Sequence, residues 1–198
     1  MPKPESIESF IGRLKDGLAR PNRYIVSFAL PPGVSGSNMD SAAGMAQAGS
    51  IHSSLTGMNE NNMVEVLCHT CSMPGRGINT TDHVHYGAPY KAPIGQDYST
   101  ANFTFNTDTK YNSRKFFELW QQTIVNIETN TLNFYKEYIA DVTIKAYDRE
   151  NKETYSVVLH EAYPISISSV ELGYGEKNSL VDVAVTMAYR YWSNEAIS

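Results

Sequence analysis

The C-terminal part of the chain alternates so regularly between apolar and polar residues that it constrains the fold more than any other segment. One set of alternate positions holds Val183, Val185, Met187, Tyr189 and Tyr191. The other set holds Asp182, Ala184, Thr186, Ala188 and Arg190. Successive side chains of a β-strand point to opposite faces, so this pattern predicts a long strand with one buried face, starting near Val181.

The segment before this strand is expected to form the other arm of a hairpin. Its polar stretch from 173 to 179 suits a turn. The apolar positions change parity across Ser168 and Ser169, which predicts a β-bulge there. The apolar residues concerned are Ile165 and Ile167 before the change, and Val170, Leu172 and Tyr174 after it.

Length and composition favour a single globular domain. The chain has 198 residues, of which 41% are hydrophobic and 11% aromatic, enough for one sizeable core. It has no apolar run of about eighteen residues and no signal-peptide pattern at its start, so we expect a soluble protein without a membrane anchor, made in the cytoplasm. A net charge of -5 argues against binding nucleic acid by neutralising its phosphates.

Periodicity predicts a mainly β protein with a flanking helix, an α+β chain. The expected helices cover residues 5–19 and about 113–127, and the expected strands or hairpin arms cover residues 23–30, 64–73, 76–95, 101–108, 141–148 and 154–165. In the second helix, Ser113 is the expected N-cap, and Phe116, Trp120, Ile124 and Ile127 form the apolar stripe. That stripe predicts packing of the helix against the sheet.

Residues 33–62 lack any steady period and are rich in Gly, Ser, Ala, Asn and Met. A segment this long without periodicity is typical of a functional loop or of a disordered arm. We expect an arm that orders on assembly and bridges neighbouring subunits, anchored by Met39, Ile51, Leu55 and Met58.

Two cysteines and two histidines raise the alternative of a small metal-binding module. Cys68, Cys71, His83 and His85 superficially match a zinc-finger order. However, the histidines are two residues apart in an extended segment, and Cys68 and Cys71 are expected to point to opposite faces of a strand. Ordinary half-buried thiols are therefore the favoured interpretation, with no metal ligands assigned.

Other short motifs fail on their context. His160-Glu161 begins like a zinc-protease motif, but Pro164 stands where the second histidine belongs. The glycines of residues 74–80 and 173–178 do not complete a dinucleotide fingerprint. We therefore expect no catalytic residues, no cofactor and no enzymatic activity.

Several short segments, taken in order, resemble the tail tube proteins of contractile-tailed bacteriophages. Residues 17–26, GLARPNRYIV, are similar to the first strand of that family, and residues 68–75 to its strand ending in Pro-Gly. The later similarities are Ile94-Gly95, the strand of Phe103 and Phe105, residues 114–124, Tyr147-Asp148-Arg149, and the closing hairpin 163–192. The resemblance covers nearly the whole chain outside residues 33–62.

The resemblance implies a β-sandwich or partly rolled barrel that assembles into hexameric rings, which stack into the inner tube of a phage tail. The implied partners are further copies of the chain and the tail sheath, baseplate and tail-terminator proteins. Phage DNA would pass through the lumen without specific binding. Related alternatives are a baseplate tube initiator, a tail-terminal ring protein, or the inner tube of a type VI-like secretion or injection machine.

The lumen is expected to be acidic. A hexameric ring of chains with net charge -5 carries about -30, which repels phosphates. The candidate lumen faces are Asp182, Thr186 and Arg190 on one strand, and Asp141, Thr143 and Lys145 on another. Arg190 and Lys145 have the alternative of pairing with carboxylates across strands.

Overall fold

The computed structural model describes residues 19–35, 67–84, 86–175 and 180–195. The expected helix 5–19 therefore lies almost wholly outside the described residues, as does the arm from residue 36 onward. The strands are β1 (Tyr24–Phe28), β2 (Cys68–Cys71), β3 (Arg76–His83), β4 (Tyr90–Tyr98), β5 (Ala101–Asn106), β6 (Ala140–Tyr147), β7 (Glu153–Ile167), β8 (Asp182–Ala188) and β9 (Tyr191–Asn194). The helices are α2 (Pro32–Ser35), α5 (Asn112–Ile124) and α6 (Tyr135–Tyr138). The mainly β class with a flanking helix is confirmed.

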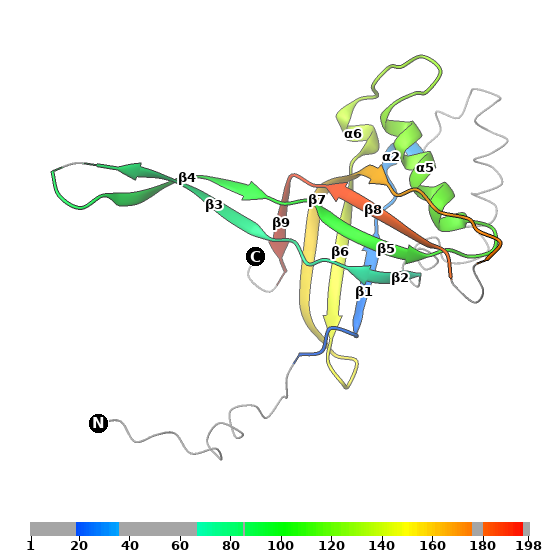
Figure 1. The fold of residues 1–198 in the computed structure, drawn as a ribbon, viewed down its shortest axis with the longest axis horizontal. Helices are drawn as coiled ribbons and strands as arrows, with labels where there is room; N and C mark the ends of the chain where they lie inside the picture. Colours follow the sequence, from blue (N-terminus) through cyan, green and yellow to red (C-terminus); the bar gives the residue numbers. More distant parts are fainter. Residues whose placement is uncertain (1–18, 36–66, 85, 176–179, 196–198) are drawn as a thin grey trace.

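The long strand β7 runs through both halves of one seven-stranded sheet. Its first half pairs with β6 on one side and β9 on the other, and its second half pairs with β8, which continues the sheet through β5 to β2. All pairings are antiparallel. Between the halves, Glu161 has a φ of 55°, and the register shifts between Pro164 and Ser166. These irregularities bend β7 from one half of the sheet into the other (Figure 1).

Among the described strands, the rolled sheet does not close through strand pairing. Its end strands β1 and β2 approach each other, and the Tyr24 hydroxyl donates to the main-chain carbonyl of His69. A side chain therefore joins β1 to β2 where a closed barrel would have a backbone ladder. The expected β-sandwich or partly rolled barrel matches this arrangement.

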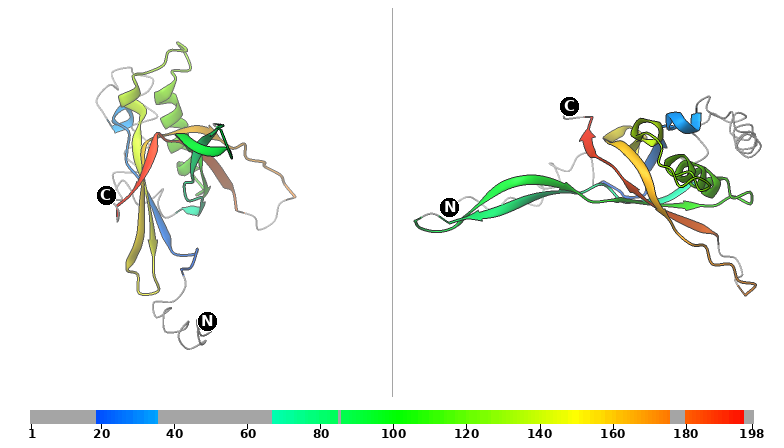
Figure 2. Two further views of the ribbon diagram at one scale, coloured as in Figure 1. Left: turned by 90° about the vertical axis from the view of Figure 1, so that its left-hand side faces the viewer. Right: turned by 90° about the horizontal axis from the view of Figure 1, so that it is seen from above.

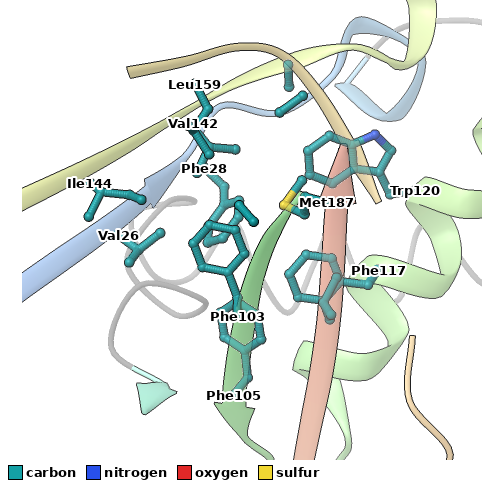
Figure 3. Packing of buried hydrophobic residues seen from close by; sticks show 14 of the residues in the cluster. Val26, Phe28, Phe103, Phe105, Phe117, Trp120, Val142, Ile144, Leu159 and Met187 are labelled. Atoms are coloured by element: carbon teal, nitrogen blue, oxygen red, sulfur yellow. The ribbon is translucent and has the colours of Figure 1, made fainter. Parts of the chain in front are cut away.

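The alternating strands form the core as predicted. Val183, Val185 and Met187 on β8 are fully buried, and they lie beside Phe103 and Phe105 of β5. Figure 3 shows how the labelled aromatic side chains converge with Met187 between the strands and α5. The buried residues contributed by β1, β6 and β7 are Val26, Phe28, Ala140, Val142, Ile144, Val157, Leu159 and Ala162. Period-two patterning thus identified the buried positions of β1, β5 and β8 correctly, whereas Tyr191, expected on the same face as Val183, lies on β9 and is 42% exposed.

Helix α5 packs as expected, but its ends differ from the prediction. Phe116 and Trp120 are buried, whereas Ile127 lies beyond the helix with 71% of its surface exposed. Ser113 is buried and is not the N-cap. Tyr111 occupies that position in a left-handed conformation, and the Asp108 carboxylate accepts the Asn112 amide at 2.8 Å. The prediction of Ser113 as N-cap was wrong because the first amide of the helix belongs to Asn112. That amide donates to the Asp108 carboxylate, which lies five residues before Ser113.

The C-terminal hairpin also departs from the prediction. β7 ends at Ile167, so residues 170–174 are not a strand, and Leu172 is 76% exposed. The register shift lies at Pro164 to Ser166 and not at Ser168 and Ser169. The final strand breaks after Ala188, because its partner β7 bends at Glu161. The chain resumes as β9 beside the first half of β7.

Helix α2 contains the beginning of the expected arm. A Cβ added to Gly33 would lie 2.6 Å from a methyl carbon of Thr123 and 2.9 Å from the carbonyl oxygen of Glu137. Glycine therefore permits α2 to lie directly against α5 and α6. Residues 33–35 are part of a packed helical layer, whereas the expectation placed them in a loop.

Candidate functional site

The hairpin of β3 and β4 is the most conspicuous surface feature. It extends away from the rest of the protein in Figure 1, and Figure 2 shows the same projection from above. Its two arms pair from Arg76 with Tyr98 to His83 with Tyr90. The extended hairpin expected from residues 76–95 is confirmed.

Large apolar side chains on this hairpin face solvent. The exposed fractions are 63% for Ile78, 71% for Val84, 61% for Tyr90 and 68% for Ile94. Isolated exposed apolar residues are ordinary on protein surfaces, but a projecting two-stranded ribbon has no core of its own beneath it. The hairpin therefore offers apolar surface that a protein partner can cover.

Sheet edges provide a second kind of contact surface. Among the described strands, β9 pairs only with β7, and β3 and β4 pair only with each other. Each of these strands consequently has one side without a described backbone partner. Such edges can accept a strand from another chain, and ring closure is one way to remove them.

The three described residues of the metal alternative do not come together. Cys68 and Cys71 lie on β2, whereas His83 lies at the far end of β3, where its ring stacks on Tyr90 at 5.6 Å. His85 lies outside the described residues. In the part of the chain that the structure describes, no group of three His, Cys, Asp or Glu side chains is placed to hold a metal ion.

The two cysteines share a face, contrary to the prediction. The register shifts between Cys68 and Thr70, so His69 is an extra residue and both thiols pack against the core. Burial, followed by the neighbouring Cys71 thiol, raises the pKa of Cys68 to about 12. Burial also raises the pKa of Cys71. Both groups are therefore protonated near neutral pH and are poor nucleophiles and metal ligands.

This burial predicts slow thiol chemistry. At pH 8 the folded protein should react with a chromogenic disulfide reagent on the order of 100-fold more slowly than the protein in guanidinium, because the thiolate is the reactive form. The buried, neutral Cys68 thiol also contributes to the free energy of unfolding. This contribution is fully present below pH 9, the usual pKa of a thiol, and should be lost as the pH rises toward 12. Equal reaction rates of the thiols in the folded and the unfolded protein would contradict their buried positions. The variants Cys68→Ser and Cys71→Ser show which thiol gives which kinetic phase of the reaction.

The candidate lumen residues lie on two differently charged faces. On the β6 face, Lys145 pairs with Glu153 at 3.1 Å, and near β8 Arg190 pairs with Glu161 at 3.0 Å. The cross-strand pairing alternative for Lys145 is thus realised, and Arg190 also meets a carboxylate on β7. The open face of β5 and β8 is mostly small and uncharged, with Asn102, Thr104, Asn106, Asp182, Ala184 and Thr186.

One arrangement has the residue types of a nucleophilic triad. The Nε2 atom of His160 lies 2.7 Å from the Ser193 hydroxyl, and its Nδ1 atom lies 3.4 Å from an Asp141 carboxylate oxygen. The three residues come from adjacent strands β9, β7 and β6, and Tyr191 stacks on the imidazole at 4.6 Å. Both ring nitrogens and one ring face are therefore engaged, so the group acts as a polar tie across three strands.

Sequence patterns missed a contact at the root of the hairpin. The guanidinium carbon of Arg76 lies 4.4 Å from the centroid of the Trp192 ring and 5.9 Å from that of Tyr98. No local spacing connects Arg76 with Trp192, since they are more than a hundred residues apart. The sequence feature that could have indicated this contact is the aromatic pair Tyr191-Trp192 at the end of the final strand.

Within the described residues, none of the helices combines the length and the apolar character that crossing a bilayer requires.

Comparisons with known proteins agree with this geometry. A search of the curated proteins finds no matching sequence. A chain of the PVC extracellular contractile injection system, in its extended sheath-tube complex, superposes with a TM-score of 0.59 at 11% identity, covering 97% of this chain and 99% of that one. A chain of the anti-feeding prophage baseplate gives 0.58 at 12% identity, covering 89% and 95%. A chain of the PVC sheath/tube terminator gives 0.59 at 12% identity, covering 90% and 96%.

These likenesses establish the fold, and the sequence establishes the family. The model of the phage tail tube proteins matches residues 19–195, which is most of the chain. That family is one of structural proteins and not of enzymes. The chain belongs to the phage tail tube protein family.

Proposed function

We propose that this protein is the subunit of the inner tube of a contractile phage tail, in which hexameric rings stack into the conduit for genome ejection. The observation that carries the proposal is the family match over residues 19–195. Its extent also supports treating residues 1–198 as one tail-tube-like domain. The protein would act in the virion after synthesis in the host bacterial cytoplasm.

The surfaces of the subunit suit such an assembly. A ring needs a head-to-tail contact that closes by rotation, and a stack needs a further contact along the axis. The edge of β9 can take part in a continuous wall shared between subunits, which removes free edges. The β3–β4 hairpin reaches far enough from the body to contact another copy, and its exposed apolar residues give that contact a driving force.

Charge supports a conduit that does not retain its cargo. The ring would carry about -30 because each chain carries -5, and the basic groups of the candidate lumen faces are already paired with carboxylates. Phosphates moving past such a wall find few cations to replace their counterions. Phage DNA would therefore pass without specific binding.

A second candidate is an inner tube of a type VI-like secretion or injection machine, or a baseplate initiator or terminal ring of the same fold. It is favoured by the similar chains from injection-system structures described as sheath-tube, baseplate and terminator assemblies. In each candidate the partners are further copies of the chain together with sheath, baseplate and tail-terminator proteins. The candidates differ in the cargo and in the position along the tube.

Electron microscopy of the purified chain tests the proposal. At high concentration we expect sixfold rings or tubes, with light scattering that rises with concentration. Rings without long tubes agree with the proposal where growth requires a nucleating partner. A compact monomer at every concentration would contradict it. Particles purified with the chain separate a phage tail from an injection machine, since a phage carries a DNA-filled capsid and an injection machine does not. The position of the chain along the particle separates a tube subunit from an initiator or a terminal ring.

A further inference from the structure

The root of the projecting hairpin is attached to the C-terminal strand through an aromatic and cationic cluster. Arg76 begins β3 and Tyr98 ends β4, so together they form the first pair of the hairpin ladder. The guanidinium of Arg76 lies over the Trp192 ring at 4.4 Å and near the Tyr98 ring at 5.9 Å. This is cation–π geometry on two rings.

Hydrogen bonds reinforce the same junction. The Trp192 indole N–H donates to the carbonyl oxygen of Gly75 at 3.3 Å, and an Arg76 Nη atom donates to the Trp192 carbonyl oxygen at 3.5 Å. The Tyr98 ring meets Tyr189 edge-on, with centroids 6.2 Å apart. Both arms of the hairpin are therefore held near the C-terminal strands.

Trp192 gives this junction a firm base. It is partly buried and packs against the hydrophobic core, and its strand β9 pairs with the first half of β7. The hairpin, in contrast, enters and leaves the fold through β2 and β5, which belong to the other half of the rolled sheet. The cluster thus fixes the hairpin relative to both halves of the sheet.

The orientation of this root matters because the hairpin is long. Eight residues of strand at about 3.3 Å each give an arm of about 26 Å, so a tilt of about 10° at the root moves the tip by about 4.5 Å. That displacement is close to the spacing of two neighbouring strands, which is about 4.8 Å. A hairpin free to tilt by this amount would meet its partner one strand out of place.

We infer that Arg76 is a positioning residue for assembly, which locks the angle of the β3–β4 hairpin through Trp192 and Tyr98 so that its tip engages a second copy of the chain. The inference rests on the proposed tube function. Arg76 need not touch the second copy. Its side chain acts through the hairpin, and its planar guanidinium suits stacking on a ring better than a lysine ammonium does.

The test compares Arg76→Ala with Lys115→Ala. Lys115 is an exposed residue of α5, outside the hairpin and its root, so its replacement removes a cation without touching the proposed contact. Two readouts are used on the full chain: amide hydrogen exchange of the unassembled subunit, and the concentration at which rings or tubes form. Arg76→Lys and Trp192→Leu complete the series.

For Arg76→Ala, exchange should rise about two- to fivefold at the hairpin root, around residues 76–78 and 96–98, and stay unchanged in β6 and β7. Each subunit brings one hairpin to the assembly, so the subunit concentration at which rings or tubes form should rise by a similar factor, about two- to fivefold. Lys115→Ala should assemble like the wild type, and Arg76→Lys should recover part of the loss. Arg76→Ala combined with Trp192→Leu should lose little more than the more affected single variant.

Assembly of Arg76→Ala at the wild-type concentration would overturn the inference. So would exchange that rises evenly over the whole chain, because that pattern indicates a general loss of stability. A wild-type chain that forms neither rings nor tubes would overturn the proposed function. In that case the exchange data still decide whether Arg76 holds the root.

Discussion

Replacing Trp120 by Ala is expected to lower the free energy of unfolding by about 3–5 kcal/mol, since it leaves a large cavity in the core. The Trp120 side chain is fully buried. Its ring lies parallel to that of Phe117, with centroids 6.4 Å apart and an interplanar angle of 10°. Its indole N–H donates to the carbonyl oxygen of Tyr138 at 2.7 Å, which ties α5 to α6. Denaturant unfolding followed by circular dichroism measures the loss.

Two control variants separate the contributions of the Trp120 ring and its hydrogen bond and test where α5 ends. Trp120→Phe keeps an aromatic ring and removes the hydrogen bond, so it should cost clearly less, about 1–3 kcal/mol. Ile127→Ala changes a residue of the predicted apolar stripe that the structure leaves exposed, and it should alter stability by less than about 0.5 kcal/mol. A stable Trp120→Ala protein, or a costly Ile127→Ala change, would contradict the observed position and end of α5.

The regular alternation of the strands explains why much of the core could be predicted from sequence. Val183, Val185 and Met187 follow period two, as do Phe103 and Phe105, and these five residues are buried. The helical spacing of Phe116 and Trp120 predicted their burial equally well. In each case the residues that share one face by the periodicity of the element are the residues that the fold buries.

Irregular backbone accounts for most of what sequence patterns missed. One extra residue at His69 turns Cys68 and Cys71 to the same face, and the left-handed conformation of Glu161 accompanies the bend of β7. A bulge changes the parity of every later residue, yet its position leaves little trace in composition. The start of α5 depends on a left-handed Tyr111, which is uncommon for a residue other than glycine.

Contacts between segments far apart in the sequence are the other features that the sequence did not predict. The group of Asp141, His160 and Ser193 assembles only because β6, β7 and β9 are neighbours, and the contact of Arg76 with Trp192 requires the hairpin root to meet β9. Single residues of these types carry no distinguishing pattern along the chain. The sequence could therefore indicate the family and its extended hairpin, but not the residues that orient the hairpin.

Shortening the β3–β4 hairpin is expected to abolish assembly while leaving the subunit folded. Residues 79–95 would be replaced by Asn-Gly, which joins Ile78 to Gln96. These two residues are Cα partners, so a two-residue turn can connect them. The root with Arg76, Tyr98 and Trp192 stays in place. Because the removed segment is almost entirely exposed, the free energy of unfolding should change by less than about 1 kcal/mol.

Electron microscopy and light scattering measure the loss of assembly. The variant Ile94→Asp in the full-length chain should also weaken assembly, because it places a charge in the apolar contact. The shortened chain keeps the surface that receives a hairpin from another copy. In a head-to-tail assembly it should therefore add to the growing structure and stop further growth when mixed with the wild type. Rings and tubes formed normally by the shortened chain would show that the hairpin is not an assembly contact, and an unfolded chain would show that the hairpin supports the core.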